Sequence, residues 1–116
     1  MCKRYFASYN SLLQRLEAEA ISKGYEYIDE LVFENGAIYR GYLHNGLREG
    51  PGVQTWPDGA KYEGEWRANQ ANGLGKFWHS DGDIYEGQWC NDQAHGRGVY
   101  LYKNGANYDG DWRHDL

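Results

Sequence analysis

The chain has 116 residues and a formal net charge of -5, with 25% charged and 41% apolar residues. This length fits one small domain or a short repeat array and excludes a multidomain enzyme. Glycine is unusually abundant, with 16 residues against 2 prolines, and it accompanies 11 tyrosines and 5 tryptophans. The aromatic content excludes a disordered linker, and the scarcity of proline excludes collagen. The glycines are therefore expected to have structural roles in a folded protein.

The segment 1–27 is predicted to be helical and to precede the rest of the fold. Residues 3–23 lack proline, and their apolar side chains recur at spacings of three and four, as in an amphipathic helix. Gly24 is expected to end this helix. Because the polar side mixes acids, amides and bases, we expect the helix to dock on protein. The sequence leaves three docking surfaces open for this helix: the chain's own sheet, a partner protein, or a bundle with copies of itself.

From position 28 onward, the sequence is periodic. Four tyrosines recur at one constant interval without insertion or deletion: Tyr39, Tyr62, Tyr85 and Tyr108. Glycines recur two residues after each tyrosine and, in the complete units, eleven and thirteen residues after it: Gly41, Gly64, Gly87 and Gly110, then Gly50, Gly52, Gly73, Gly75, Gly96 and Gly98. This 23-residue period divides the chain into a half unit 28–38, full units 39–61, 62–84 and 85–107, and a half unit 108–116.

Each unit is expected to hold two antiparallel strands. In the pattern Tyr-x-Gly-x-Trp, the tyrosine and the tryptophan share one face of a strand, and the glycine leaves a gap that a neighbour's ring can fill. The intervening residues are polar, which predicts an exposed opposite face. Asp-Gly or Asn-Gly at 58–59, 81–82 and 104–105 predicts a hairpin turn, because both residues tolerate positive φ. The predicted fold class is mainly β: a single-layer antiparallel meander of about eight strands, roughly 40 Å long.

Three short motifs recur in the units 62–84 and 85–107. They read Tyr-Glu-Gly-Glu-Trp, Asn-Gly-Leu-Gly and Ser-Asp-Gly in the first, and Tyr-Glu-Gly-Gln-Trp, His-Gly-Arg-Gly and Asn-Gly in the second. With these motifs in unbroken register, the chain resembles the MORN (membrane occupation and recognition nexus) repeat family. Leu43 departs from the pattern, because the other units have tryptophan there. The resemblance implies a scaffold at cytoskeletal, ciliary or membrane-junction structures, or an accessory subunit of a larger assembly.

The sequence offers no convincing catalytic, cofactor or metal site. Cys90 and His95 could supply two ligands, whereas a zinc site needs three or four. The Gly-x-Gly triplets lack the third glycine of a nucleotide-binding loop, and the acid pair Glu63 and Glu65 recurs as part of an exposed strand face. Cys2 and Cys90 are expected to be free thiols. We therefore expect a protein that is not an enzyme and that uses no cofactor and no metal.

Protein is the expected partner class. The sequence pI of about 5.3 provides no basic stripe for nucleic acid. Residues 39–116 hold 8 Lys and Arg against 11 Asp and Glu, so a phosphoinositide-binding membrane adaptor is the weaker alternative. A regulatory segment of a longer enzyme is another alternative. We expect a helix or an extended peptide in an aromatic groove, or strand pairing at the C-terminal edge of the sheet.

The side chains expected to anchor a partner lie on the aromatic strand face, and each serves equally well for packing within the sheet. They are Tyr62, Trp66, Tyr85, Trp89, Tyr108 and Trp112 on the first strands, and Trp56, Trp78 and Tyr102 on the second strands. No segment reads as a membrane span, and we expect a cytoplasmic protein associated with the cytoskeleton or a cilium. Import into an organelle is the alternative, suggested by Lys3, Arg4 and Arg15 ahead of the first acidic residue.

Overall fold

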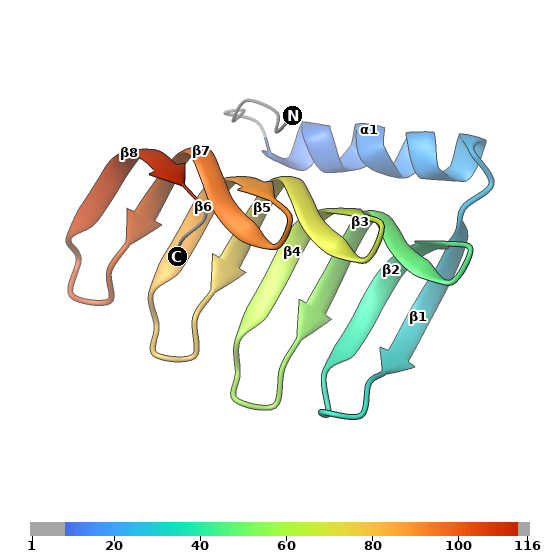
Figure 1. Ribbon diagram of the computed structural model, residues 1–116, viewed down its shortest axis with the longest axis horizontal. Helices are drawn as coiled ribbons and strands as arrows, with labels where there is room; N and C mark the ends of the chain where they lie inside the picture. Colours follow the sequence, from blue (N-terminus) through green and yellow to red (C-terminus); the bar gives the residue numbers. More distant parts are fainter. Residues whose placement is uncertain (1–8, 114–116) are drawn as a thin grey trace.

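The computed structural model describes the backbone of residues 9–113 and the side chains of residues 13–111. One helix precedes eight strands: α1 (Tyr9–Ser22), β1 (Glu26–Val32), β2 (Ile38–His44), β3 (Leu47–Thr55), β4 (Lys61–Arg67), β5 (Gln70–Trp78), β6 (Ile84–Cys90), β7 (Gln93–Leu101) and β8 (Asn107–Arg113). The strands form one antiparallel sheet in chain order, with a longest extent of 40 Å (Figure 1). The predicted fold class is confirmed. The boundaries of the units stay a prediction, and β1 begins two residues before the expected position 28.

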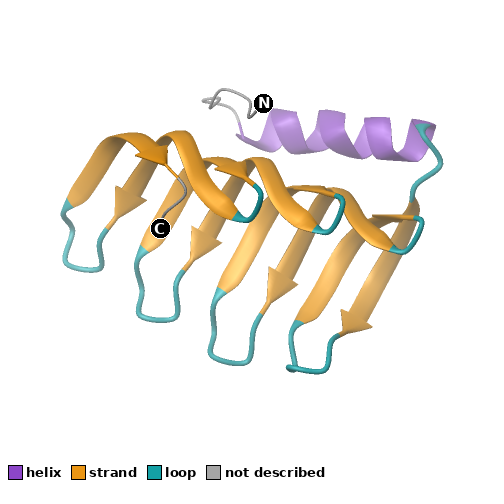
Figure 2. Cartoon of the chain, viewed as in Figure 1, coloured by secondary structure: helices purple, strands orange, loops and turns teal. Residues whose placement is uncertain are grey.

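Two kinds of turn alternate at the two ends of the strands (Figure 2). The predicted turns at 58–59, 81–82 and 104–105 lie in the longer loops, but only their glycines adopt positive φ. Asp58 stabilises its loop with the side chain instead, since Oδ1 accepts a hydrogen bond of 3.0 Å from the N–H of Ala60. The turns with two positive φ values join β2 to β3, β4 to β5 and β6 to β7, with φ of 48° and 75° at Ala68 and Asn69.

The buried tyrosines lie over pairs of glycines that face each other on adjacent strands. Gly64 and Gly75 are directly opposite in register, and a Cβ added to Gly75 would lie 2.5 Å from Cζ and 2.6 Å from Cε1 of Tyr62. The Tyr62 hydroxyl donates a hydrogen bond of 2.9 Å to the carbonyl of Glu65. Tyr39 and Tyr85 repeat this arrangement. The prediction that a neighbour's ring fills the glycine gap is therefore wrong, because the tyrosine of the same strand fills it.

The tryptophans connect one tyrosine to the next. Trp66 contacts the rings of Tyr39 and Tyr62 edge to face, with centroids 5.6 and 5.1 Å away. Trp89 contacts Tyr62 and Tyr85 in the same way, at 5.2 and 5.3 Å. Each of the two indole N–H groups donates a hydrogen bond of 3.1 Å to a glycine carbonyl on the preceding strand. The core is therefore a chain of rings that runs along one face of the sheet, which we call the aromatic face.

The helix α1 docks on its own sheet, one of the three surfaces left open by the sequence. Ala20 is buried and approaches Gly50 of β3, while Leu16 packs against Leu74 of β5. Gly24 has φ of +77° and ends the helix as predicted, with the N–H of Tyr25 bonded to the carbonyl of Ala20 at 3.0 Å. The predicted helix residues 3–8 lie outside the described part of the chain.

The face of the sheet opposite the aromatic face is not uniformly exposed, contrary to the prediction. Leu74 lies on this face and is only 2% exposed, because α1 covers it. Gln88, a polar residue of the Tyr-x-Gly-x-Trp pattern, is 5% exposed. Its Oε1 accepts a hydrogen bond of 2.6 Å from the N–H of Arg97, which satisfies the buried amide oxygen.

We expect Gly64→Ala to destabilise the fold by about 2–3 kcal/mol, because overpacking a close strand pair forces the backbone apart. The added Cβ would lie 2.5 Å from the carbonyl oxygen of Leu74 and would also meet the backbone of Gly75. Urea unfolding followed by tryptophan fluorescence measures the change. Gly46→Asn is the matched control: nothing lies within 4 Å of its added Cβ, and the equivalent turn position in the next unit is Asn69. A Gly64→Ala variant as stable as Gly46→Asn would contradict the role of the glycine pair.

Candidate functional site

The predicted anchor residues divide into buried and accessible groups. Tyr62, Trp66, Tyr85 and Trp89 are at most 5% exposed and pack inside the aromatic core. Trp56 is half-buried, and Tyr102 and Tyr108 are 43% and 46% exposed. The side chain of Trp112 lies outside the described part of the chain. A partner can therefore reach Trp56, Tyr102 and Tyr108 without opening the core, and the binding role of all these residues stays a prediction.

Trp78 is not on the aromatic face, so its predicted placement there is wrong. It lies opposite Lys61 in the register of β4 and β5, on the other face of the sheet. The ammonium groups of Lys61 and Lys76 each lie 4.8 Å from the centroid of its ring. Trp78 is one position out of phase with the period, because the equivalent of Trp56 in the next unit is His79.

A row of accessible rings completes the aromatic face; Trp56 and Tyr102 were predicted from the sequence, but the three rings between them were missed. Neighbouring rings are 4.5–5.8 Å apart from Trp56 through Phe77, His79 and Tyr100 to Tyr102. We call these five residues the outer aromatic row. Phe77 and Tyr100 share one repeat position, and Trp56, His79 and Tyr102 share the position two residues later. Strict counting of the repeat period would have identified them from the sequence.

Tyr100 is fixed in this row by an acidic partner. Its hydroxyl donates a hydrogen bond of 3.0 Å to Oδ2 of Asp83, whose Oδ1 accepts a hydrogen bond of 2.7 Å from the N–H of Lys103. Burial raises the pKa of Tyr100 to about 12, and the bond to Asp83 acts in the same direction. The phenol therefore stays a hydrogen-bond donor throughout the neutral pH range.

Arg48 occupies the aromatic face in the first unit. Its guanidinium carbon lies 4.4 Å from the ring centroid of Trp66 and 5.1 Å from that of Phe33. The guanidinium donates hydrogen bonds of 2.8 and 2.9 Å to the side-chain and backbone oxygens of Asn69, and another to the buried Gln54. Burial lowers the pKa of Arg48, while the charge of Asp92 raises it.

An open, mostly apolar pocket of about 290 Å³ adjoins Arg48 on the aromatic face. We call it the aromatic pocket, and its lining is Arg48, Trp56, Tyr62, Trp66, Ala71, Phe77, Trp89 and Asp92. Asp92 lies at the turn between β6 and β7, and its Oδ1 accepts a hydrogen bond of 2.7 Å from the N–H of Ala71. The pocket therefore combines aromatic walls with one carboxylate, that of Asp92, and one guanidinium, that of Arg48.

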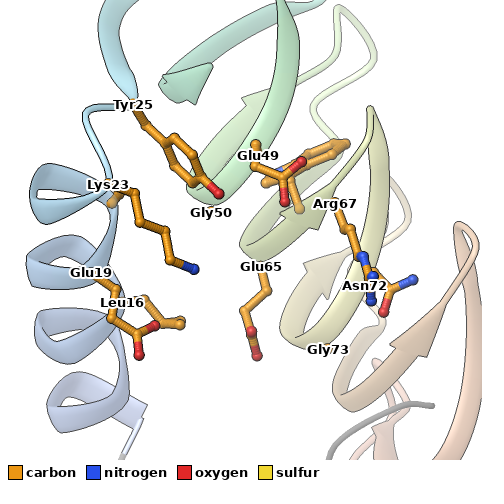
Figure 3. A pocket seen from close by; sticks show the side chains of 12 residues that line it. Leu16, Glu19, Lys23, Tyr25, Glu49, Gly50, Glu65, Arg67, Asn72 and Gly73 are labelled. Carbon is orange, nitrogen blue, oxygen red and sulfur yellow. The ribbon is translucent and has the colours of Figure 1, made fainter. Parts of the chain in front are cut away.

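A second pocket, of about 220 Å³, lies between α1 and the sheet (Figure 3). Two of its acidic side chains form hydrogen bonds to the backbone: Glu65 accepts one of 2.7 Å from the N–H of Leu74, and Glu49 accepts one of 3.0 Å from the N–H of Ala68. Lys23 and Arg67 line the same space, so charges of both signs face it. Glu49 and Glu65 thus bind backbone N–H groups, a structural role.

Among the described residues 9–113, no group of three or more histidine, cysteine or acidic side chains is placed to hold a metal ion. Cys90 is a half-buried free thiol, and Cys2 lies outside the described residues. Across this same part of the chain, no helix has the length and apolar character needed to span a membrane.

Comparison with known proteins gives one family. The family model described as MORN repeat matches residues 39–61, 62–84 and 85–106, which together make up more than half of the chain. The limits of these matches follow the predicted full units to within one residue. No curated protein matches the sequence.

The raised pKa of Tyr100 predicts a loss of stability at alkaline pH. A phenol with a higher pKa in the folded protein than its ordinary value of about 10 stabilises the fold while it stays protonated. This contribution is complete below pH 10 and is lost as the pH rises through about 12, the pKa of Tyr100. We expect the free energy of unfolding to fall over this range, and less steeply in Tyr100→Phe. Urea titrations at several pH values measure both slopes, and equal slopes would contradict the prediction.

We expect Arg48→Ala to lower the free energy of unfolding by about 2 kcal/mol, because it removes a stacked cation and leaves the amide of the buried Gln54 without its donor. Urea denaturation measures the change. Arg67→Ala is the matched control, since this arginine is exposed and its removal should change stability by no more than about 0.5 kcal/mol. Equal effects of the two substitutions would show that the stacking of Arg48 contributes nothing.

Proposed function

This chain belongs to the MORN repeat family, and from that premise we propose that it is a non-catalytic scaffold that holds a partner polypeptide on its outer aromatic row. MORN repeats are generally protein- or membrane-interaction modules, and the family is typically non-catalytic. The observation that carries the proposal is the outer aromatic row itself. Its rings are in continuous contact along one face of the sheet, from Trp56 to Tyr102, yet they remain partly exposed.

The physical basis of binding is a large apolar surface that needs little ordering. Aromatic side chains have few rotatable bonds and bury a large area on contact, so they bind at a small entropic cost. In this row the rings support one another, and Tyr100 is also held by Asp83. A helix or an extended peptide laid across the strands would contact several units at once, because the row crosses from β3 to β7.

Protein is favoured over lipid as the partner. Lys61 and Lys76 flank Trp78 on the opposite face, but Glu63 lies directly across from Lys76 in the register of β4 and β5. Recognition of anionic headgroups depends on clusters of basic side chains, and this acid interrupts such a cluster. We propose that the protein is cytoplasmic and serves as an accessory subunit of a cytoskeletal, ciliary or other large assembly.

Site-specific photo-crosslinking in cell extract tests the proposed binding face. A photoreactive phenylalanine replaces Tyr102, which is 43% exposed in the outer aromatic row. The same substitution at Tyr27 is the matched control, because Tyr27 is 54% exposed and pairs with Tyr42 on the opposite face. We expect discrete protein adducts from position 102 and none from position 27.

Two results would overturn this proposal. The first is a stable monomer that forms no adduct from position 102 under gentle extraction. The second is efficient co-sedimentation with phosphoinositide vesicles at physiological salt, which would favour the membrane-adaptor alternative over a protein scaffold.

A further inference from the structure

The residues that surround the side chain of Arg48, which we call its frame, have counterparts one unit later, but the arginine itself does not. Moving forward by one repeat period gives Ala71 for Arg48, Trp56 for Phe33, Trp89 for Trp66, Phe77 for Gln54 and Asp92 for Asn69. The two frames share the same backbone contacts. The N–H of residue 48 bonds to Oδ1 of Asn69 at 3.1 Å, and the N–H of residue 71 bonds to Oδ1 of Asp92 at 2.7 Å. The return bonds, from the N–H of Asn69 and of Asp92, measure 2.9 and 3.0 Å.

The aromatic pocket occupies this second frame. Ala71 is too short to reach the space that the Arg48 side chain fills in the first unit, and the walls there are Trp56, Phe77 and Trp89. The Phe77 ring lies 5.8 Å from that of Trp56 and 6.0 Å from that of Trp89, both edge to face. The resulting space of about 290 Å³ is open to solvent. The chain thus contains both a filled and an empty version of the same arginine site.

The charge of the empty version suits a cation from outside. In the filled frame the acceptor is the neutral amide of Asn69, whereas Asp92 supplies a carboxylate at the same position. A cation between an aromatic face and a carboxylate gains both cation–π attraction and a charge-assisted hydrogen bond. Arg48 also borders the pocket, where burial lowers its pKa and the nearby carboxylate charge of Asp92 raises it, but its hydrogen bonds go to Asn69 and Gln54.

We propose that the aromatic pocket receives an arginine side chain of the partner polypeptide, stacked against Trp56 and Trp89 and bonded to Asp92. This inference rests on the proposed function and specifies the chemistry of the partner. The planar guanidinium of arginine can stack and donate at its edge at the same time, as Arg48 does with Trp66 and Asn69. A lysine ammonium has no planar surface to stack, so the geometry selects arginine.

Titration of the whole chain with three capped tripeptides tests the inference. The probes are Gly-Arg-Gly, Gly-Lys-Gly and Gly-citrulline-Gly, the last being a neutral analogue of nearly the same shape as arginine. The readout is the NMR shift of the indole N–H resonances of Trp56 and Trp89. We expect saturable shifts with the arginine probe, and at least tenfold weaker binding of the citrulline and lysine probes.

Two variants connect the signal to the pocket. Ala71→Arg places the chain's own arginine in the second frame, so the arginine probe should cause no saturable shift while the thermal stability is retained or raised. Asp92→Asn copies the acceptor of the first frame without adding bulk, and it should weaken binding of the arginine probe about fivefold or more. Asp92→Asn keeps the test valid even where Ala71→Arg disturbs folding.

The results that would overturn this inference differ from those that would overturn the proposed function. Equal binding of arginine and citrulline, or of arginine and lysine, would overturn the inference, and so would unchanged binding in Asp92→Asn. Photo-crosslinking from position 102 that persists at full yield in Ala71→Arg would also overturn it, because the partner would then bind without the pocket. Absence of crosslinking from position 102 in the chain that keeps Ala71 would remove the proposed function itself.

Discussion

The contact between a tyrosine ring and two facing glycines determines the rest of this structure. The ring of Tyr62 can lie flat on the sheet only because neither Gly64 nor Gly75 has a side chain. Once it lies there, its hydroxyl reaches the carbonyl of Glu65, and its edge is available to the tryptophans on both sides. A one-layer sheet cannot bury its apolar face against a second sheet, so these flattened rings form its core.

Much of this arrangement could be predicted from the sequence, because repetition reveals register. Eight antiparallel strands and the end of the helix at Gly24 follow from glycine spacing and apolar periodicity. The placement of Trp78 was mistaken, because an aromatic residue one position out of phase looks equivalent until strand pairing is known. The docking of α1 depends on contacts distant in sequence, such as Leu16 with Leu74, and no local pattern specifies such a pair.

The candidate site was harder to predict than the fold. The most conspicuous aromatic residues of the repeat, such as Trp66 and Trp89, are used by the core, and the accessible row includes the less regular positions Phe77 and His79. Sequence composition reports how many rings exist but not which ones remain exposed. The aromatic pocket is invisible for the same reason, since it arises from what Ala71 lacks relative to Arg48.

The hydroxyl contacts of the tyrosines also differ along the array. Tyr39 and Tyr85 are fully buried, with hydroxyl bonds of 2.7 and 2.9 Å, whereas the corresponding distance at Tyr108 is 3.4 Å and the ring is 46% exposed. The inner rings rest on a glycine of the strand that follows, so each unit is completed by its successor. Neighbouring units therefore stabilise one another, and a substitution that disturbs one glycine also loosens the tyrosine of the strand before it.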